Sequence, residues 1–213
     1  MTRSLSTKNL FDKKPKRLLN LNHPVLKEAI GPAERKGCWL IYGYEKNGKT
    51  WLAGFLVKEL AKSEKVWYIS AEEGTDESFK DGMRRAGVTT AVKVQWDEYI
   101  PMEDIITELT SGTKKRTGIV VIDNLTMYLD EITAKELKKR LIDAFPDKLF
   151  ILLAHEDRKE PAGAVARMAK KIAKVILHVK GLTAFIISRH APGGELVIDE
   201  DKCAIYHGEY ERV

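Results

Sequence analysis

The sequence predicts an α/β fold in a single domain, with a mostly parallel central sheet flanked by helices on both faces. Segments of helical periodicity alternate with short apolar runs along most of the 213 residues. Several of these runs are continuous stretches of Val, Ile and Leu, which is typical of parallel strands buried on both faces. Near the C-terminus, strand-like segments follow one another with only a few residues between them. We therefore expect antiparallel strands at the C-terminal end of the sheet.

The predicted elements follow one another in a regular order. Short runs rich in Val, Ile, Leu and aromatic residues predict strands, and apolar residues spaced three and four apart predict helices. The expected strands are 37–43, 65–70, 92–96, 118–125 and 148–155, and the expected helices between them are 50–61, 76–87, 102–112 and 132–145. The expected C-terminal strands are a pair within 174–188, joined at Lys180-Gly181, and a second pair at 195–199 and 203–207.

Composition and charge limit the class of protein. Lys and Arg outnumber Asp and Glu by 36 to 31, a formal charge of +5, which permits attraction to nucleic acid without demonstrating it. No apolar run has the length needed to cross a bilayer, and the basic start lacks the apolar centre and cleavage site of a secretion signal. We expect a cytoplasmic protein with no membrane partner. Residues 1–20 are expected to be either a disordered tail or an arm between subunits, and residues 21–213 the folded domain.

The segment from Gly43 to Thr50 has the spacing G-x-x-x-x-G-K-[ST] and lies between an expected strand and an expected helix, as this phosphate-binding motif requires. Its glycines allow the backbone N–H groups to point inward, and the N-terminal dipole of the following helix favours anions. Lys49 is expected to reach the β- and γ-phosphates of ATP, and the Thr50 hydroxyl to coordinate Mg²⁺. The residues expected to bind nucleotide are Gly43, Tyr44, Glu45, Lys46, Asn47, Gly48, Lys49, Thr50 and Trp51.

Acidic residues follow two of the expected strands. One buried strand ends in Asp123, which we expect to bind Mg²⁺ together with Thr50. Residue 124 is Asn rather than Glu, so a base that activates water has to come from elsewhere. Glu72 and Glu73 follow the second strand, at the edge of the sheet where ligands bind in such folds. We expect Glu72 to orient the attacking water, with Glu73 as the alternative.

These segments resemble the RecA-like ATPases, the family of RecA, RadA and the DnaB-type replicative helicases. In that family a catalytic Glu follows the second strand in a hydrophobic-Ile-Asp-Ala-Glu pattern, and YISAE matches it with Glu72 in the catalytic place. The resemblance covers roughly residues 24–210 and is most specific in the phosphate loop, the strand of Asp123 and SAEEG. It implies that residues 21–213 form a single RecA-like P-loop NTPase domain, which hydrolyses ATP as part of a ring or filament.

The resemblance also implies roles for two residues further along the chain. His155 ends an expected strand where the family has a Gln or His that senses the γ-phosphate, and the alternative is a capping or core histidine. Arg189 matches an Arg that reaches the nucleotide of the neighbouring subunit, although the family's Lys two residues earlier is Ile187 here. The alternative for Arg189 is a surface loop. The implied catalytic residues are Lys49, Glu72, Asp123, His155 and Arg189.

The segment 155–175 lies where RecA-like proteins carry a loop that touches single-stranded DNA. Its Lys and Arg residues are candidates for phosphate contacts that do not depend on DNA sequence, since the loop has no Phe, Tyr or Trp to stack on bases. The alternative is a solvated helix face, because several of these cations recur at helical spacing. The candidate DNA-binding residues are Arg158, Lys159, Arg167, Lys170 and Lys171, with Lys174 beside them.

The first functional hypothesis is a DNA-stimulated ATPase that acts in recombination, repair or replication and shares its active sites between subunits. A ring helicase would need the same parts and directional strand transport as well. A regulatory protein similar to the KaiC-like branch would bind ATP without responding to DNA. A small-molecule kinase is the fourth alternative, and the absence of an Arg-rich lid with an acceptor-site motif argues against it.

Overall fold

A sheet of nine strands forms the centre of the computed structural model, which describes residues 4–14 and 17–204. The strands are β1 (Gly37–Gly43), β2 (Val66–Ser70), β3 (Val94–Asp97), β4 (Ile119–Asp123), β5 (Leu149–Asp157), β6 (Glu160–Pro161), β7 (Val175–Lys180), β8 (Thr183–Ser188) and β9 (Gly194–Val197). Their order in the sheet is β3-β2-β4-β5-β1-β7-β8-β9, and β6 pairs with β5 outside this path. Neighbours from β3 to β7 are parallel, and β8 and β9 continue the sheet in antiparallel fashion. The predicted fold class is confirmed.

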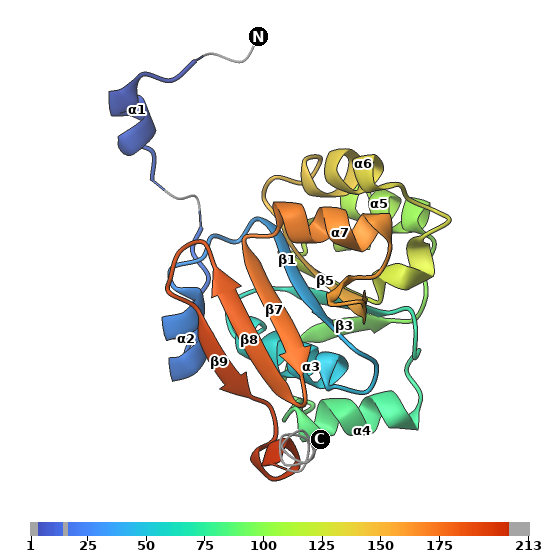
Figure 1. Cartoon of the computed structure of the whole chain (residues 1–213). Coiled ribbons are helices and arrows are strands. Elements are labelled where there is room, and N and C mark those ends of the chain that lie inside the picture. The colour runs from blue at the N-terminus through green and yellow to red at the C-terminus, as the bar shows by residue number, and fades with distance from the viewer. Residues whose placement is uncertain (1–3, 15–16, 205–213) are drawn as a thin grey trace.

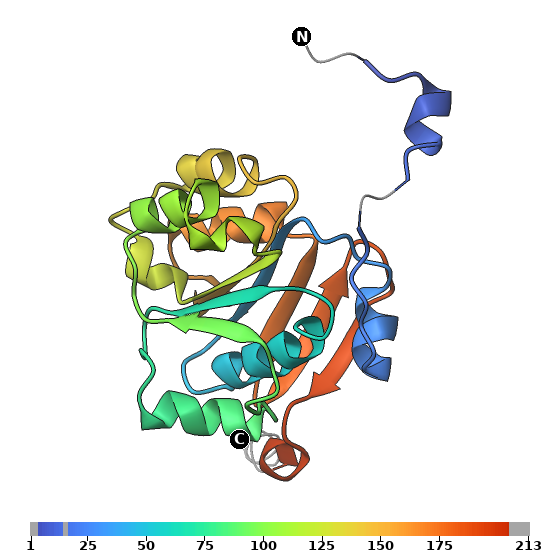
Figure 2. The same cartoon turned by 180° about the vertical axis from the view of Figure 1, so that it is seen from behind.

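Helices cover both faces of the parallel part of the sheet (Figures 1 and 2). The α-helices are α1 (Thr7–Phe11), α2 (Pro24–Ile30), α3 (Lys49–Leu60), α4 (Glu77–Arg85), α5 (Met102–Thr110), α6 (Ala134–Glu136) and α7 (Gly163–Ile172). Shorter turns are η1 (Thr113–Arg116) and η2 (Leu125–Tyr128), and η3 (Leu137–Ile142) is a π-helix. One hydrophobic core lies between the sheet and α2, α3 and α4, and a second lies between the sheet and α5, η3 and α7.

The central strands form because their side chains are buried on both faces. The four residues of β4 that precede Asp123 are all Ile or Val, and all are fully buried. Alternate residues of this strand enter the two cores, so a continuous apolar run is what both helical layers require. The strand then ends with Asp123 at the carboxyl edge of the sheet, where the polar residues of the candidate site gather.

The predicted helix at 132–145 forms with a hydrogen-bond pattern that periodicity did not reveal. Thr133 and Glu136 form a reciprocal capping box at its start, and the chain then continues as the π-helix η3. Leu137 and Leu141 of this segment are fully buried in the core below it. Apolar spacing therefore predicted which side of the segment is buried, whereas it does not separate an α-helix from a locally wider one.

The predicted strand at 203–207 is wrong for the residues that the structure describes. Cys203 and Ala204 belong to a short helical segment, 200–204, and 205–207 lie outside the described residues. Asp199 explains the helix: its side chain accepts from the Lys202 N–H at 3.0 Å, and its carbonyl accepts from the Cys203 N–H at 2.9 Å. This acidic cap favours a helix over a strand. The preceding strand, β9, pairs with β8 instead.

The N-terminal segment joins the domain only at its end. Helix α1 has no buried residue and projects away from the domain (Figure 1). Further along, the Leu19 N–H donates to the Ala33 carbonyl at 2.9 Å, and Leu18 forms a β-bridge with Glu34. The role of residues 1–20 as a disordered tail or an arm between subunits stays a prediction. None of the described helices has both the length and the apolar character needed to span a membrane.

Candidate active site

The phosphate loop connects β1 to α3, and both of its motif glycines are required by close packing. A Cβ atom on Gly43 would lie 2.1 Å from the Val179 carbonyl oxygen of the neighbouring strand. Gly48 has a φ of +95°, and a Cβ there would lie 2.6 Å from Leu182. Lys46, at the bend of the loop, also has a positive φ of 59°. The loop thus curls tightly over the N-terminus of α3, which is the geometry that surrounds a phosphate with backbone N–H groups.

Lys49 lies inside this loop at the first residue of α3. Its Nζ donates to the Tyr44 carbonyl at 2.9 Å, which folds the side chain back along the loop. Burial lowers the pKa of Lys49, although the carboxylates of Asp123 and Glu72 partly oppose this shift. The loop is fastened to the β7–β8 turn by Asn47, whose Oδ1 accepts from the Gly181 N–H at 2.7 Å. The Lys49 ammonium is therefore placed among groups that change when an anion binds.

Asp123 lies beside the start of α3, at the end of β4. Its carboxylate accepts hydrogen bonds from the Thr50 hydroxyl and from the Tyr68 hydroxyl, the latter at 2.6 Å. Burial raises the pKa of Asp123 to about 6, and these two donors limit the rise. A hydroxyl and a carboxylate oxygen in contact are suitable ligands for Mg²⁺, which takes its remaining ligands from phosphates and water. The residues present therefore fit a magnesium ion that binds together with a nucleotide.

Glu72 is brought to Asp123 by pairing between β2 and β4. Beyond the last strand pair, Ser70 with Asp123, the N–H groups of Ala71 and Glu72 donate to the Asp123 carbonyl at 2.6 and 3.2 Å. The Glu72 carboxylate accepts from Asn124 Nδ2 at 3.0 Å and pairs with His155 Nε2 at 2.9 Å. The contact with His155, and to a smaller extent Asn124, holds the pKa of Glu72 below its ordinary value.

Glu73 differs from Glu72 in its environment, although both line the same pocket. Burial and the nearby carboxylates of Glu72 and Asp76 raise the pKa of Glu73. Two adjacent carboxyl groups therefore have pKa values shifted in opposite directions, an arrangement that is common where acid and base roles are divided. The ionised group with fixed orientation is Glu72, which agrees with its choice as the water-orienting residue.

A pocket of about 470 Å³ brings these groups together. Its walls come from the phosphate loop, the start of α3, the ends of β2, β4 and β5, helix α4 and the C-terminal segment. The lining residues are Glu45, Lys46, Gly48, Lys49, Thr50, Trp51, Glu72, Glu73, Ser78, Phe79, Gly82, Arg85, Asp123, His155, Leu182 and Lys202. Four of the five predicted catalytic residues and most of the predicted nucleotide-binding residues thus share one cavity.

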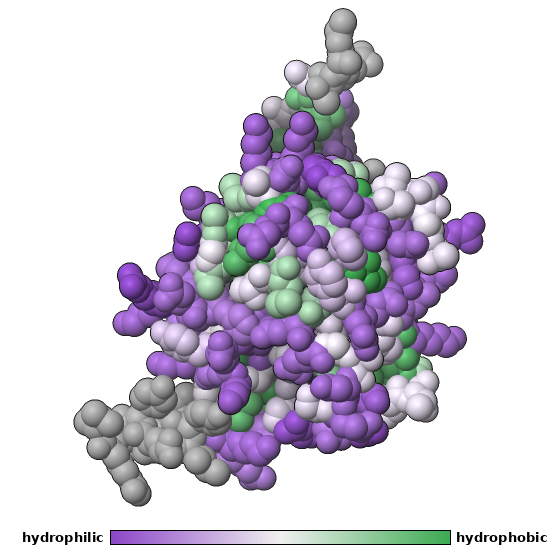
Figure 3. Space-filling model, turned by 90° about the vertical axis from the view of Figure 1, so that its right-hand side faces the viewer, coloured by the Kyte–Doolittle hydropathy of each residue, from purple (hydrophilic) through white to green (hydrophobic). Residues whose placement is uncertain are grey.

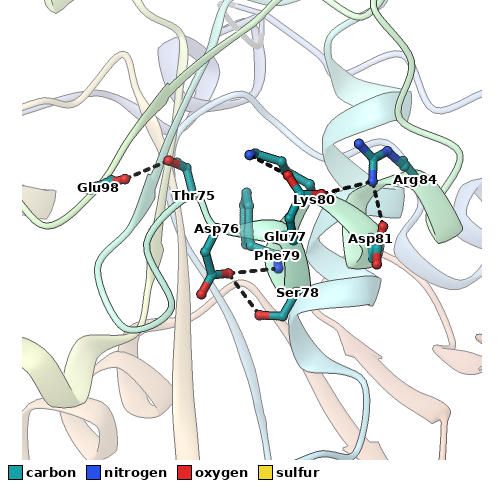
Figure 4. A network of polar contacts seen from close by, with 9 residues as sticks. All are labelled: Thr75, Asp76, Glu77, Ser78, Phe79, Lys80, Asp81, Arg84 and Glu98. Atoms are coloured by element: carbon teal, nitrogen blue, oxygen red, sulfur yellow. Dashed lines mark hydrogen bonds and ion pairs between the residues drawn. The ribbon is translucent and has the colours of Figure 1, made fainter.

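Helix α4 forms the outer wall of this pocket and begins soon after Glu73. Asp76 caps it by accepting from the Phe79 N–H at 3.3 Å and from the Ser78 hydroxyl at 2.9 Å (Figure 4). The preceding residue, Thr75, donates to Glu98 at 2.6 Å, which ties the turn to the loop after β3 (Figure 4). These contacts fix the direction in which α4 leaves the site.

Arg189 is not part of the pocket of its own chain. It follows β8, which runs antiparallel to β7, and its N–H donates to the Lys174 carbonyl at the amino edge of the sheet. Ser188 pairs with Val175, whereas Gly43 of the phosphate loop pairs with Val179. Those two partners are four residues apart, about 13 Å along a strand. Arg189 therefore lies at the edge opposite to the phosphate loop, and any contact with a nucleotide has to involve another subunit.

The candidate DNA-binding residues occupy different environments. Arg158 and Lys159, with φ of 50° and 69°, form the exposed tip of a hairpin between β5 and β6, while Arg167 and Lys171 are exposed on α7. Lys170 instead pairs with Glu160 at 2.8 Å and lies over the Tyr42 ring. Lys174 pairs with Glu34 at 3.3 Å. From the side of α5, α6 and α7, the surface is mainly hydrophilic (Figure 3).

Sequence reasoning missed several residues that shape the pocket. Tyr68 supports Asp123, and its position in a buried strand was the available signal, since a buried tyrosine hydroxyl usually finds a partner. Asn124 was noted only as the absence of a Glu, yet its amide holds Glu72. Arg85 and Lys202 also line the pocket, from segments whose proximity no local pattern reveals.

Comparisons with known proteins agree with this geometry at the level of the fold. No family model and no curated protein matches the chain. Among solved structures, the ATPase domain of a replicative helicase is similar with a TM-score of 0.56 and 16% identity, over 80% of this chain and 84% of that one. The flagellar accessory protein FlaH from Methanocaldococcus jannaschii is similar with a TM-score of 0.59 and 15% identity, over 84% and 91%.

A third similar structure is the ATP synthase subunit NeqB from Nanoarcheaum equitans, with a TM-score of 0.56 and 14% identity, over 79% of this chain and 52% of that one. All three neighbours are P-loop ATPases of the RecA-like type. The chain therefore has the RecA-like P-loop ATPase fold, which confirms the resemblance inferred from its motifs.

Proposed function

We propose that this protein hydrolyses ATP in a RecA-like assembly that acts on single-stranded DNA in recombination, repair or replication. The observation that carries the proposal is the union of three parts in one pocket. They are the phosphate loop with Lys49, the pair of Thr50 and Asp123, and a Glu72 carboxylate held by two neighbours. The RecA-like fold supports the same conclusion.

The chain's own groups have distinct tasks in this proposal. The loop N–H groups and Lys49 bind the β- and γ-phosphates, and Thr50 and Asp123 hold Mg²⁺, which offsets negative charge on the phosphate oxygens when bound. Glu72 is ionised near neutral pH because its pKa is lowered, so it is able to accept a hydrogen bond from water and orient it toward the γ-phosphate. Asn124 and His155 fix the direction of that carboxylate.

His155 links this site to the candidate DNA-binding hairpin. Its ring contacts Glu72, and its backbone carbonyl accepts from the Ala162 N–H at 2.8 Å, which closes the hairpin carrying Arg158 and Lys159. A change in contacts around Glu72 upon hydrolysis would therefore be transmitted to the hairpin through one residue. We propose that this is how nucleotide state alters DNA binding.

The central test is steady-state ATP hydrolysis with and without single-stranded DNA, at low and moderate salt. Lys49→Ala should reduce the rate by at least about 100-fold, because it removes a cation that stabilises charge on the transferred phosphoryl group. DNA should raise the wild-type rate, and salt should weaken this stimulation. Equal rates in wild type and Lys49→Ala would refute the enzymatic proposal.

DNA binding through the hairpin has its own test. The double variant Arg158→Gln, Lys159→Gln should bind DNA more weakly, and the slope of log affinity against log salt should fall by about 1.4. The matched control is Lys135→Gln, Lys139→Gln, which removes the same charge from exposed positions on α6 and η3. Equal effects from the two pairs would show that only the overall charge matters.

Sharing of sites between subunits is tested by mixing. Arg189→Ala chains retain Glu72, and Glu72→Gln chains retain Arg189. If Arg189 acts in a neighbouring site, equal mixing should restore roughly a quarter of the wild-type rate, because one random interface in four combines both intact residues. A verified mixed oligomer without recovery would exclude this role.

A second candidate is an ATP-responsive regulatory protein whose partners are other proteins. The observation that favours it is the pairing of Lys170 and Lys174 with acidic residues, which reduces the cationic surface available to DNA. The similarity in fold to a flagellar accessory protein is consistent with it. ATP hydrolysis without any salt-sensitive DNA binding would favour this candidate over the first.

A further inference from the structure

The outer part of the pocket contains an aromatic ring approached by two cations. The Arg85 guanidinium lies 5.5 Å from the centroid of the Trp51 indole, and Lys202 Nζ lies 5.8 Å from it. All three residues line the same pocket as Lys49 and Thr50. Trp51 directly follows Thr50 in the first turn of α3, so its ring lies next to the end of the phosphate site.

Close packing of helices brings Arg85 to this ring. A Cβ atom on Gly54 of α3 would lie 2.8 Å from Met83 Sδ and 2.9 Å from the Ala86 Cβ at the end of α4. Only glycine permits this approach, and it places Arg85, between those two residues, over Trp51. The Arg85 Nε also donates to the Asp81 carbonyl at 3.3 Å, which keeps the side chain along its own helix.

Lys202 reaches the ring from a separate element. It belongs to the helical segment 200–204, whose first turn is capped by Asp199. Both Arg85 and Lys202 are exposed, long side chains, whereas Trp51 is half-buried at the base of the pocket. The ring is thus a fixed surface and the two cations are movable groups above it.

This arrangement suits a flat, electron-rich ligand. Stacking on an aromatic side chain accepts any base, because every base has a π-face, and an Arg guanidinium stacks in the same way. Arg and Lys donors match the acceptor atoms N7 of purines and O6 of guanine. A purine would therefore have both stacking and hydrogen bonds here, whereas a pyrimidine would have less ring area and no N7.

We propose that Trp51 is the stacking surface for the nucleobase and that Arg85 and Lys202 close over it, so that the site binds purine nucleotides with little distinction between adenine and guanine. This inference rests on the proposed nucleotide-binding function and extends it to the class of base. Trp51 and Arg85 are then residues that determine specificity, and neither takes part in phosphoryl transfer.

Calorimetric titration with ADP, GDP, CDP and pyrophosphate, in the presence of Mg²⁺, tests the proposal. The wild type should bind ADP and GDP similarly and CDP more weakly. Trp51→Ala should weaken ADP and GDP by about tenfold, the value expected for the loss of one stacked base. Its affinity for pyrophosphate should not change, and Trp51→Phe should retain most of the ADP affinity.

Arg85 has a matched control in the preceding residue. Arg84 is also exposed on α4, but it pairs with Asp81 and Glu77 outside the pocket (Figure 4). Arg85→Ala should weaken ADP by about threefold, as expected for one exposed cation–π contact, and Arg84→Ala should have no effect. An equal loss of ADP and pyrophosphate affinity in Trp51→Ala, or no loss of either, would overturn the proposal. A Lys49→Ala protein that binds pyrophosphate normally would instead refute the underlying nucleotide site.

Discussion

Two buried lysines at opposite edges of the sheet show how the same residue type serves different purposes. Lys49 at the carboxyl edge and Lys148 at the amino edge are 7% and 3% exposed, and burial lowers the pKa of both. Lys148 donates to the carbonyls of Lys115 and Thr117, both at 2.7 Å, and so fastens the loop before β4 to the start of β5. Lys49 contacts a carbonyl of its own loop and connects no separate elements.

The carboxyl edge also carries charges that the amino edge avoids. Asp123 is buried there with a raised pKa, and Glu72 and Glu73 lie close enough to raise it further. At the amino edge, Lys174 pairs with Glu34, which matches its charge. The comparison indicates that the carboxyl edge is arranged for a charged ligand at some cost in stability, whereas the amino edge holds the fold together. The predictions below test this division.

The largest effect is expected for Glu72. Glu72→Gln should lower the rate of ATP hydrolysis by at least about 100-fold, because the amide is unable to accept a proton as the carboxylate does. Nucleotide affinity should remain near the wild-type value. Glu73→Gln is the matched control, and its effect on turnover should be smaller. A larger loss from Glu73→Gln would transfer the role to that residue.

Asp123→Asn should separate stability from activity. The pKa of Asp123 is raised from 3.8 to about 6, so the folded state holds the proton more tightly than the unfolded state. The ionised carboxylate therefore destabilises the fold above pH 6, and the asparagine variant should gain up to about 3 kcal/mol in free energy of unfolding at pH 7.5. This gain should disappear near pH 4, where the carboxyl is protonated in both states.

Urea unfolding at pH 4 and pH 7.5 measures this difference, and ATP hydrolysis measures the accompanying loss. A variant that is less stable than the wild type at pH 7.5 would show that the hydrogen bonds from Tyr68 and Thr50 outweigh the burial of charge. In that case the carboxyl edge would not differ from the amino edge in its contribution to stability.

A smaller effect is expected for the two lysines themselves. Lys148→Met should lower the free energy of unfolding by about 2 kcal/mol, because it leaves two carbonyls without their donor. Lys49→Met should leave stability unchanged or slightly increased, while nucleotide binding is lost. Thermal unfolding of both variants, together with ADP titration, is the measurement. Equal destabilisation by the two substitutions would contradict the division between the edges.

Much of the site could be predicted because its residues stand at positions that local sequence defines. The phosphate loop is a contiguous motif, and Asp123 and Glu72 each follow an apolar run that ends at the sheet edge. Their meeting follows from parallel pairing of β2 with β4, which places the ends of both strands at one edge. The helical segment 200–204 was mistaken for a strand because its apolar residues outweighed the acidic cap in the interpretation.

What the sequence by itself determined is the alternation of elements, the phosphate loop and the acidic residues after the strands, because each depends on neighbours along the chain. Only the tertiary structure decided that Asn124 and His155 hold Glu72, that Arg189 lies at the opposite edge, and that Lys170 is paired. These relations depend on the order β2-β4-β5-β1 and on the direction of β8. Strand order is set by packing between distant segments, and a local pattern carries no record of it.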